Sequence, residues 1–105
     1  PDIVSARYDV VQGQLPRLSF SILSSKAAFL HNYTLVGGRY CSLQGELAAQ
    51  LRVADRVDGD TLTVYVCKLA AALEGMAPLE KSYEGVDIRL WEDGDRLFAL
   101  ARSRD

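Results

Sequence analysis

Few side chains in this sequence belong to the types that carry out catalysis or hold metals. His31 is the only histidine, and no serine lies in a Gly-x-Ser-x-Gly turn, so no nucleophile stands beside an evident base. Cys41, Cys67 and His31 are three possible zinc ligands, but they lack the close paired spacing of structural zinc motifs. The sequence therefore favours a capping or solvent-facing role for His31 and indicates neither a triad nor a metal centre; no cofactor is expected.

Two acidic groups have the composition of a calcium loop, since carboxylate oxygens are the ligands that Ca²⁺ prefers. They are Asp55, Asp58 and Asp60, and then Glu92, Asp93 and Asp95. Each group flanks a glycine in a predicted hairpin turn, where Asp is favoured because its side chain bonds the local backbone. Turn formation therefore explains both groups without a metal.

Gly37-Gly38 has the small residues of a phosphate-binding loop, but such a loop leads into a helix N-terminus and no helix follows here. Glycines inside a strand more often mark a bulge or a close approach of another backbone. We therefore expect this pair to serve the fold.

A mixed face of aromatic and cationic residues is the best candidate for a partner surface. It is formed by Arg89, Trp91, Arg96 and Phe98, in two strands joined across a predicted turn at Asp93-Gly94. This register places Trp91 opposite Arg96 and Arg89 opposite Phe98, and it leaves only apolar residues on the other face. Aromatic and Arg residues dominate binding energy at interfaces, so we expect Trp91 to be exposed there; a structural cation–π ladder is the alternative.

These residues must be positioned by strands, and the clearest hairpin in the chain turns at Gln44-Gly45. The turn places Ser42 opposite Leu47 and Cys41 opposite Ala48. Along the second strand, alternate residues from Leu47 to Val53 are apolar, which is the pattern of a half-buried strand.

The other expected elements follow the chain in order. A helix over 26–31, capped by Ser24 or Ser25, precedes the hairpin; a strand over 61–67 follows it; and helical composition over 69–73 leads to a polar loop over 80–85. The first 24 residues give the weakest pattern: a short helix over 1–8, a connection over 10–18 and an extended segment over 18–23.

Together these elements predict an α+β fold: an antiparallel meander of about five strands, with one to three short helices on one face. The 105 residues form a single domain, and its 49% hydrophobic and 25% charged composition is that of an ordinary globular protein. The net charge of −2 argues against a nucleic-acid partner. In a meander, Cys41 and Cys67 are separated by a central strand, so we expect two free thiols.

Several motifs resemble the extracytoplasmic domain of bacterial transmembrane anti-sigma factors. The first is Leu35-Val36-Gly37-Gly38-Arg39, followed by the turn at Gly45 and a strand that contains Ala49-Gln50. Thr61-Leu62-Thr63-Val64 and the aromatic turn Trp91-Glu92-Asp93-Gly94 keep the order of the family's later elements. The resemblance covers about Lys26 to Arg102, and the first 25 residues match poorly.

The resemblance implies a non-enzymatic periplasmic sensor or docking domain, whose partner is a protein or another signal in the periplasm. A sigma factor would be held only by an upstream cytoplasmic segment, and the membrane would be reached only through an upstream helix. We therefore expect residues 1–105 to be a fragment of a longer membrane-anchored protein. The alternative is a small cytoplasmic ligand-binding module or enzyme with a concave sheet.

Overall fold

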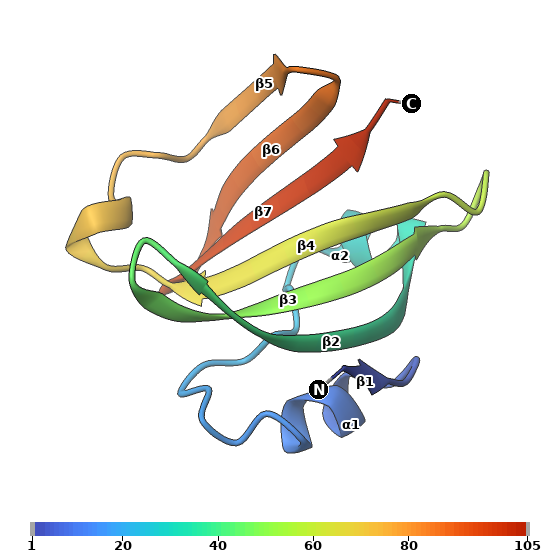
Figure 1. Cartoon of the computed structure of the whole chain (residues 1–105), viewed down its shortest axis with the longest axis horizontal. Helices are drawn as coiled ribbons and strands as arrows, with labels where there is room; N and C mark the ends of the chain where they lie inside the picture. The colour runs from blue at the N-terminus through green and yellow to red at the C-terminus, as the bar shows by residue number, and fades with distance from the viewer. Residues whose placement is uncertain (1, 105) are drawn as a thin grey trace.

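A computed structural model describes residues 2–104, which form one antiparallel sheet with short helices packed against it (Figure 1). Its seven strands lie in the order β1-β2-β3-β4-β7-β6-β5. They are β1 (Ile3–Val4), β2 (Tyr33–Leu43), β3 (Glu46–Asp55), β4 (Thr61–Lys68), β5 (Leu79–Tyr83), β6 (Val86–Asp93) and β7 (Arg96–Ser103). The antiparallel sheet of the predicted α+β fold is confirmed, with more strands than the five expected.

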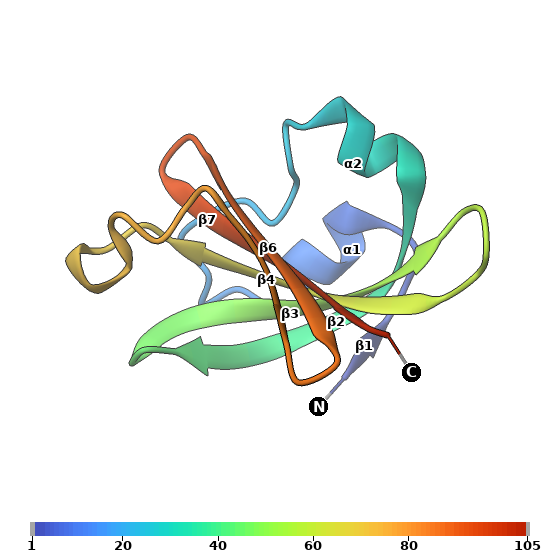
Figure 2. The same ribbon diagram turned by 90° about the horizontal axis from the view of Figure 1, so that it is seen from above.

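Two α-helices and one 3₁₀ turn complete the fold of residues 2–104. Helix α1 (Tyr8–Gly13) and helix α2 (Ala27–Asn32) both precede the long strands, and η1 (Ala71–Leu73) lies between β4 and β5. Seen from above, α1 and α2 lie on the same side of β2 and β3 (Figure 2). No helix within residues 2–104 is long and apolar enough to cross a membrane.

The strand order departs from a simple meander after β4, because β7 rather than β5 pairs with it. The chain leaves β4, passes through η1, and forms β5 at the far edge before β6 and β7 return toward the centre. Most of this connection is exposed, but Leu73 in η1 is 2% exposed and packs with Cys67, Leu90 and Leu97. This small apolar cluster lies on the face of the sheet away from α1 and α2, and it holds the crossover in place.

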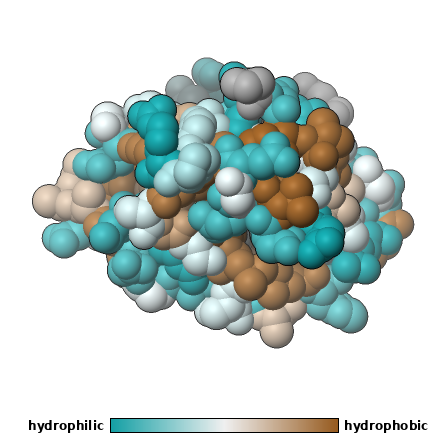
Figure 3. Space-filling view, turned by 90° about the horizontal axis from the view of Figure 1, so that it is seen from below, coloured by the Kyte–Doolittle hydropathy of each residue, from teal (hydrophilic) through white to brown (hydrophobic). Residues whose placement is uncertain are grey.

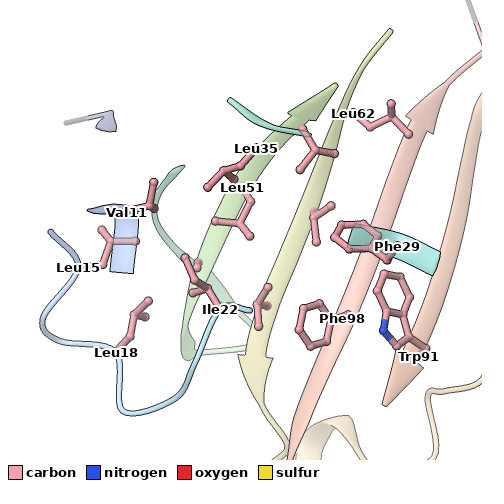
Figure 4. Close-up of a cluster of buried hydrophobic side chains, with 14 residues drawn as sticks. Val11, Leu15, Leu18, Ile22, Phe29, Leu35, Leu51, Leu62, Trp91 and Phe98 are labelled. Atoms are coloured by element: carbon pink, nitrogen blue, oxygen red, sulfur yellow. The ribbon is translucent and has the colours of Figure 1, made fainter. Parts of the chain in front are cut away.

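The main core lies between the sheet and the segment that carries α1 and α2 (Figure 4). Strand residues on this helix-covered face follow the predicted alternation: Leu51 and Val53 in β3, Val64 and Val66 in β4, and Phe98 in β7 are all at most 1% exposed. Val11, Leu15, Ile22 and Phe29 reach this face from the N-terminal segment, and each is at most 6% exposed. Burying such side chains supplies the main driving force for folding.

The N-terminal segment differs most from its predicted structure. Residues 3–4 are a strand, the helix begins at Tyr8, and residues 18–23 form no strand. Helix α2 has its N-cap at Lys26 rather than at Ser24 or Ser25, although the Ser24 hydroxyl accepts a hydrogen bond from the Lys26 amide at 3.0 Å. The apolar residues of this segment follow no helix or strand period, because their spacing is determined by contact with the sheet.

Gly37 and Gly38 each allow a different part of this segment to approach β2. A side chain at Gly37 would place its Cβ 2.2 Å from the carbonyl oxygen of Ile3 in β1, and one at Gly38 would lie 2.8 Å from Val11 in α1. Between Leu35 and Gly37 the register shifts by one residue, which is a β-bulge. The predicted bulge and close backbone approach are both confirmed, whereas no phosphate loop is formed.

Seen from below, the region around β1 and α1 shows hydrophobic residues between hydrophilic ones (Figure 3). Val4 in β1 is 85% exposed, whereas Ile3 is half-buried and packs against the main core. The backbone of β1 pairs with β2, with Ile3 opposite Gly38 and Val4 opposite Gly37.

Candidate functional site

The hairpin that carries the predicted partner surface has a register two residues away from the predicted one. Trp91 pairs with Phe98 and Arg89 with Leu100, and Asp93 pairs with Arg96, so that Gly94-Asp95 forms the turn. Gly94 has φ of +64°, as the first position of a type II′ turn requires. A shift of two residues keeps every side chain on its predicted face.

The expectation that this mixed face is exposed is nevertheless wrong for three of its four residues. Phe98 is 0% and Trp91 9% exposed, and their rings stack with centroids 5.3 Å apart. The Arg96 side chain is 12% exposed. The reason is that α2 covers this part of the face: the ring centroids of Phe29 in α2 and Trp91 lie 5.5 Å apart. Only Arg89 remains exposed.

Arg96 and Asp93 tie the hairpin to the chain before α2. The guanidinium of Arg96 lies 3.1 Å from the Asp93 carboxylate and also donates hydrogen bonds to the carbonyls of Ser21 and Leu23. The carboxylate accepts from the Ser25 amide and hydroxyl, each at 2.7 Å. These bonds from Ser25, with Arg96 beside them, lower the pKa of Asp93 below its ordinary value. This cluster therefore has a structural role.

The acidic group of Asp55, Asp58 and Asp60 surrounds the guanidinium of Arg102. Arg102 lies 2.7 Å from Asp55, 3.6 Å from Asp58 and 3.3 Å from Asp60. The Val57 amide and Arg102 both lower the pKa of Asp55. Because Arg102 occupies the centre that a calcium ion would need, the group closes the β3–β4 turn onto β7 instead.

The other chemical candidates also fail to converge. His31 is exposed on α2, over the helix-covered face, whereas Cys41 and Cys67 lie on the opposite face with Ala48 between them. Within residues 2–104 no three His, Cys, Asp or Glu side chains form a group that could hold a metal. Both cysteines are free, as predicted, and burial raises the pKa of each thiol.

The open part of the helix-covered face lies beyond α2, over β7, β6 and β5. A groove of about 410 Å³ is lined there by Glu80, Ser82, Asp87, Arg89, Leu100 and Arg102, among others. Arg89 crosses it and lies 3.3 Å from Glu80, and the Ser82 hydroxyl donates to Asp87. A further hollow of about 290 Å³ continues along Arg89 and Trp91 to Lys26. Cationic and anionic groups alternate along this groove, which suits binding of a polar chain.

Trp91 lines the adjoining hollow together with Lys26 and Arg89. Lys26 places its ammonium 5.1 Å from the centre of the Trp91 ring, on which Phe98 also stacks. The indole Nε1 is one of two buried polar side-chain atoms within residues 2–104 that have no hydrogen-bond partner; the other is the Tyr8 hydroxyl.

Sequence reasoning missed the groove because it assigned residues 80–85 to a loop. Glu80, Lys81 and Ser82 belong to β5, which pairs with β6 through a turn at Glu84-Gly85. Both turn residues have positive φ, 50° and 81°, which is the type I′ pattern. The available signal was this two-residue turn, since Lys81 between Leu79 and Tyr83 interrupts the apolar alternation of a strand.

The motif residues quoted for the family resemblance have structural positions. Gly45 lies in the β2–β3 turn with φ of +80°, Ala49 is fully buried, and Gln50 is half-buried on the opposite face. Arg39 is exposed and lies 3.4 Å from Asp2. Comparisons of this chain with known protein families, with curated proteins and with solved structures found no match.

Proposed function

We propose that this domain is a non-enzymatic docking or sensor domain from the extracytoplasmic part of a membrane-anchored anti-sigma factor. The observation that carries the docking role is the groove beside β5, where polar and charged side chains line an open surface next to a sheet edge that no other strand of residues 2–104 covers. The anti-sigma assignment rests on the sequence resemblance, above all on the Leu35–Arg39 motif.

Signalling requires that the partner bind one state of the full-length protein more tightly than another. The difference in binding free energy then shifts the equilibrium between sigma-holding and sigma-releasing states. The domain itself contributes the partner-binding surface, and a cytoplasmic segment would hold the sigma factor.

The test uses the full-length protein in its own cells. When the full-length protein is purified from membranes, a sigma factor should co-purify with it and be identified by mass spectrometry. No sigma factor should co-purify with residues 1–105 alone. In spheroplasts the domain should be digested by added protease while a cytoplasmic marker survives. Purification without a sigma factor, or protection of the domain in spheroplasts, would contradict the proposal.

The volume of the groove also favours a second candidate, a small-molecule binding module. Arg89 would then meet an anionic group of the ligand, next to the apolar contact that Leu100 offers. A thermal-shift screen of small carboxylates and phosphates against the wild type and Arg89→Ala tests this reading. Stabilisation of the wild type that Arg89→Ala abolishes would support it.

A further inference from the structure

The two edges of the sheet are treated differently. At one edge β1 pairs with β2, and Gly37 leaves room for the β1 backbone. At the other edge no strand formed by residues 2–104 lies beyond β5, and all five of its residues are exposed. Native proteins usually blunt or cover such an edge, because its unpaired backbone groups are a template for another strand.

The backbone groups that face outward from β5 can be assigned from its turn. Glu84-Gly85 is a two-residue turn, so Tyr83 and Val86 form the hydrogen-bonded pair that closes it. Such pairs alternate along an antiparallel ladder, which directs the amides of Glu80 and Ser82 away from β6. No backbone hydrogen bond outside the strand ladders engages either amide within residues 2–104. Both amides are therefore available to an incoming strand.

The side chains of β5 define what this strand would have to contain. Leu79, Lys81 and Tyr83 share the opposite face of the sheet, with Leu79 39% and Tyr83 60% exposed. Lys81 lies between them, and no carboxylate pairs with it within residues 2–104. Its nearest aromatic neighbour is Tyr83, with the ammonium 5.8 Å from the ring centre. An added strand would meet an apolar residue, a cation and another apolar residue in turn.

We propose that β5 docks an extended segment of a protein partner, which joins the sheet as a further strand through the outward amides of Glu80 and Ser82. The segment carries an acidic residue opposite Lys81, flanked two positions away on each side by apolar residues opposite Leu79 and Tyr83. This pattern reads the same in both chain directions, so it holds for parallel and antiparallel addition. The inference rests on the docking role proposed above and names the partner's chemistry.

A second copy of the chain fits this edge less well. Full antiparallel overlap of two β5 strands would place Lys81 directly opposite Lys81 of the other copy, and like charges in directly opposed positions are destabilising. The same position in a heterologous strand can hold a carboxylate, which is favourable. Charge complementarity therefore selects a different chain as the occupant.

The experiment is an NMR titration of residues 1–105, labelled with ¹⁵N, with the peptide acetyl-Thr-Val-Thr-Glu-Thr-Val-Thr-amide. Saturable shifts and slowed hydrogen exchange are expected at the amides of Glu80 and Ser82. Replacing the peptide's Glu by Lys should weaken binding by about threefold, as opposed charges across strands contribute modestly. Lys81→Glu should reverse the preference between the two peptides.

Two variants control this result. Arg52→Glu changes an exposed arginine in the same cross-sheet row as Lys81, through Thr63, Ala101 and Ile88, and should leave both affinities unchanged. Ser82→Pro removes one outward amide and should abolish binding, while unchanged core resonances of Val64 and Phe98 show that the fold is kept. Proline is tolerated at a strand edge where its nitrogen faces solvent.

Three outcomes would overturn the inference. They are an absence of saturable shifts at Glu80 and Ser82, an equal response of both peptides to Lys81→Glu, and protection of these amides that rises with protein concentration without peptide. The last outcome would identify a second copy as the occupant. If the full-length protein still brings down its sigma factor while the titration fails, only the edge assignment is lost; peptide binding without a sigma factor would instead reject the anti-sigma role.

Discussion

At the scale of single residues, Gly38 and Gly45 are both part of the β2–β3 hairpin but satisfy different requirements. Gly45 is needed for its backbone, since its φ of +80° is costly for most residues and its missing Cβ faces open space. Gly38 has an ordinary φ, and its missing Cβ leaves room for Val11 and Leu51. The position of the turn could be predicted from sequence, whereas the contact with Val11 could not, because it joins segments that no local pattern relates.

We therefore predict that Gly38→Val destabilises the domain more than Gly45→Asn does. A side chain at position 38 would lie 2.8 Å from Val11 and 3.0 Å from Leu51, and overpacking of a core costs about 1–3 kcal/mol. Asn tolerates positive φ and should lose little at the turn. Urea unfolding of both variants measures the difference, and equal midpoints would contradict the packing of α1 on β2.

The stability of the domain should depend on pH through Asp93. Its pKa is lowered in the folded state by hydrogen bonds from Ser25, so this stabilisation is complete above the ordinary Asp pKa of about 3.9 and is lost as the pH falls through the folded value. Asp93→Asn should cost about 1.5–3 kcal/mol at pH 7, and the difference from wild type should shrink below about pH 4. Asp95→Asn, in the same turn but exposed, is the control. A difference that stays constant from pH 7 to pH 3 in urea titrations would refute this role.

At the scale of elements, the register of the β2–β3 hairpin was predictable and the structure of the N-terminal segment was not. The β2–β3 register, with Cys41 opposite Ala48, agrees with the turn at Gln44-Gly45 because that turn and the apolar alternation require the same pairing. In the β6–β7 hairpin, turns at two different positions were compatible with the same apolar alternation. The predicted pairing register was therefore wrong by two residues. Helix α1 and strand β1 have too few residues for a period, so only contact with the sheet determines them.

The prediction that the mixed face of β6 and β7 is an exposed partner surface was wrong for a related reason. Alternation shows which residues of β6 and β7 share a face, but both faces of this hairpin are packed at one end: Trp91 and Phe98 under α2, and Leu90 and Leu97 under η1. A sequence pattern cannot reveal which face a distant helix will cover. For the candidate site, the sequence could predict only that Arg89 is exposed and that Arg89, Trp91, Arg96 and Phe98 share one face.

Strand order can be tested through the two cysteines. Strand β3 separates β2 from β4, and two strand spacings of about 4.8 Å exceed the roughly 7 Å that a disulfide can span between Cα atoms. Alkylation after denaturation without reductant should therefore label both thiols. In the native state Cys41, which is half-buried, should react faster than Cys67, which is 1% exposed. Unlabelled cysteines, or faster reaction of Cys67, would place these strands differently.

At the scale of the whole molecule, the sheet and the N-terminal segment bury their apolar side chains against each other. β2, β3, β4 and β7 present a continuous apolar surface, and two short helices with their connecting chain supply its only cover within residues 2–104. Helices of six residues are marginal by themselves, so α1 and α2 are in turn held by the sheet. The cluster around Arg96 ties this segment to one end of β7, and the cluster around Arg102 closes the β3–β4 turn onto the other end.

The family resemblance begins at Lys26, yet we predict that residues 26–105 alone do not fold. Truncation would remove Val11, Leu15, Leu18 and Ile22, each at most 9% exposed. Burial of each is worth about 1.5–3 kcal/mol, so together they approach the 5–15 kcal/mol that stabilises a typical domain. The truncated chain should lack amide dispersion in NMR spectra and bind a dye that reports exposed apolar surface. Removing only residues 1–5 should keep the fold, since β1 is a two-residue edge strand in which Val4 is 85% exposed and Ile3 only half-buried. A dispersed spectrum from residues 26–105 would mean that the sheet does not need its N-terminal cover.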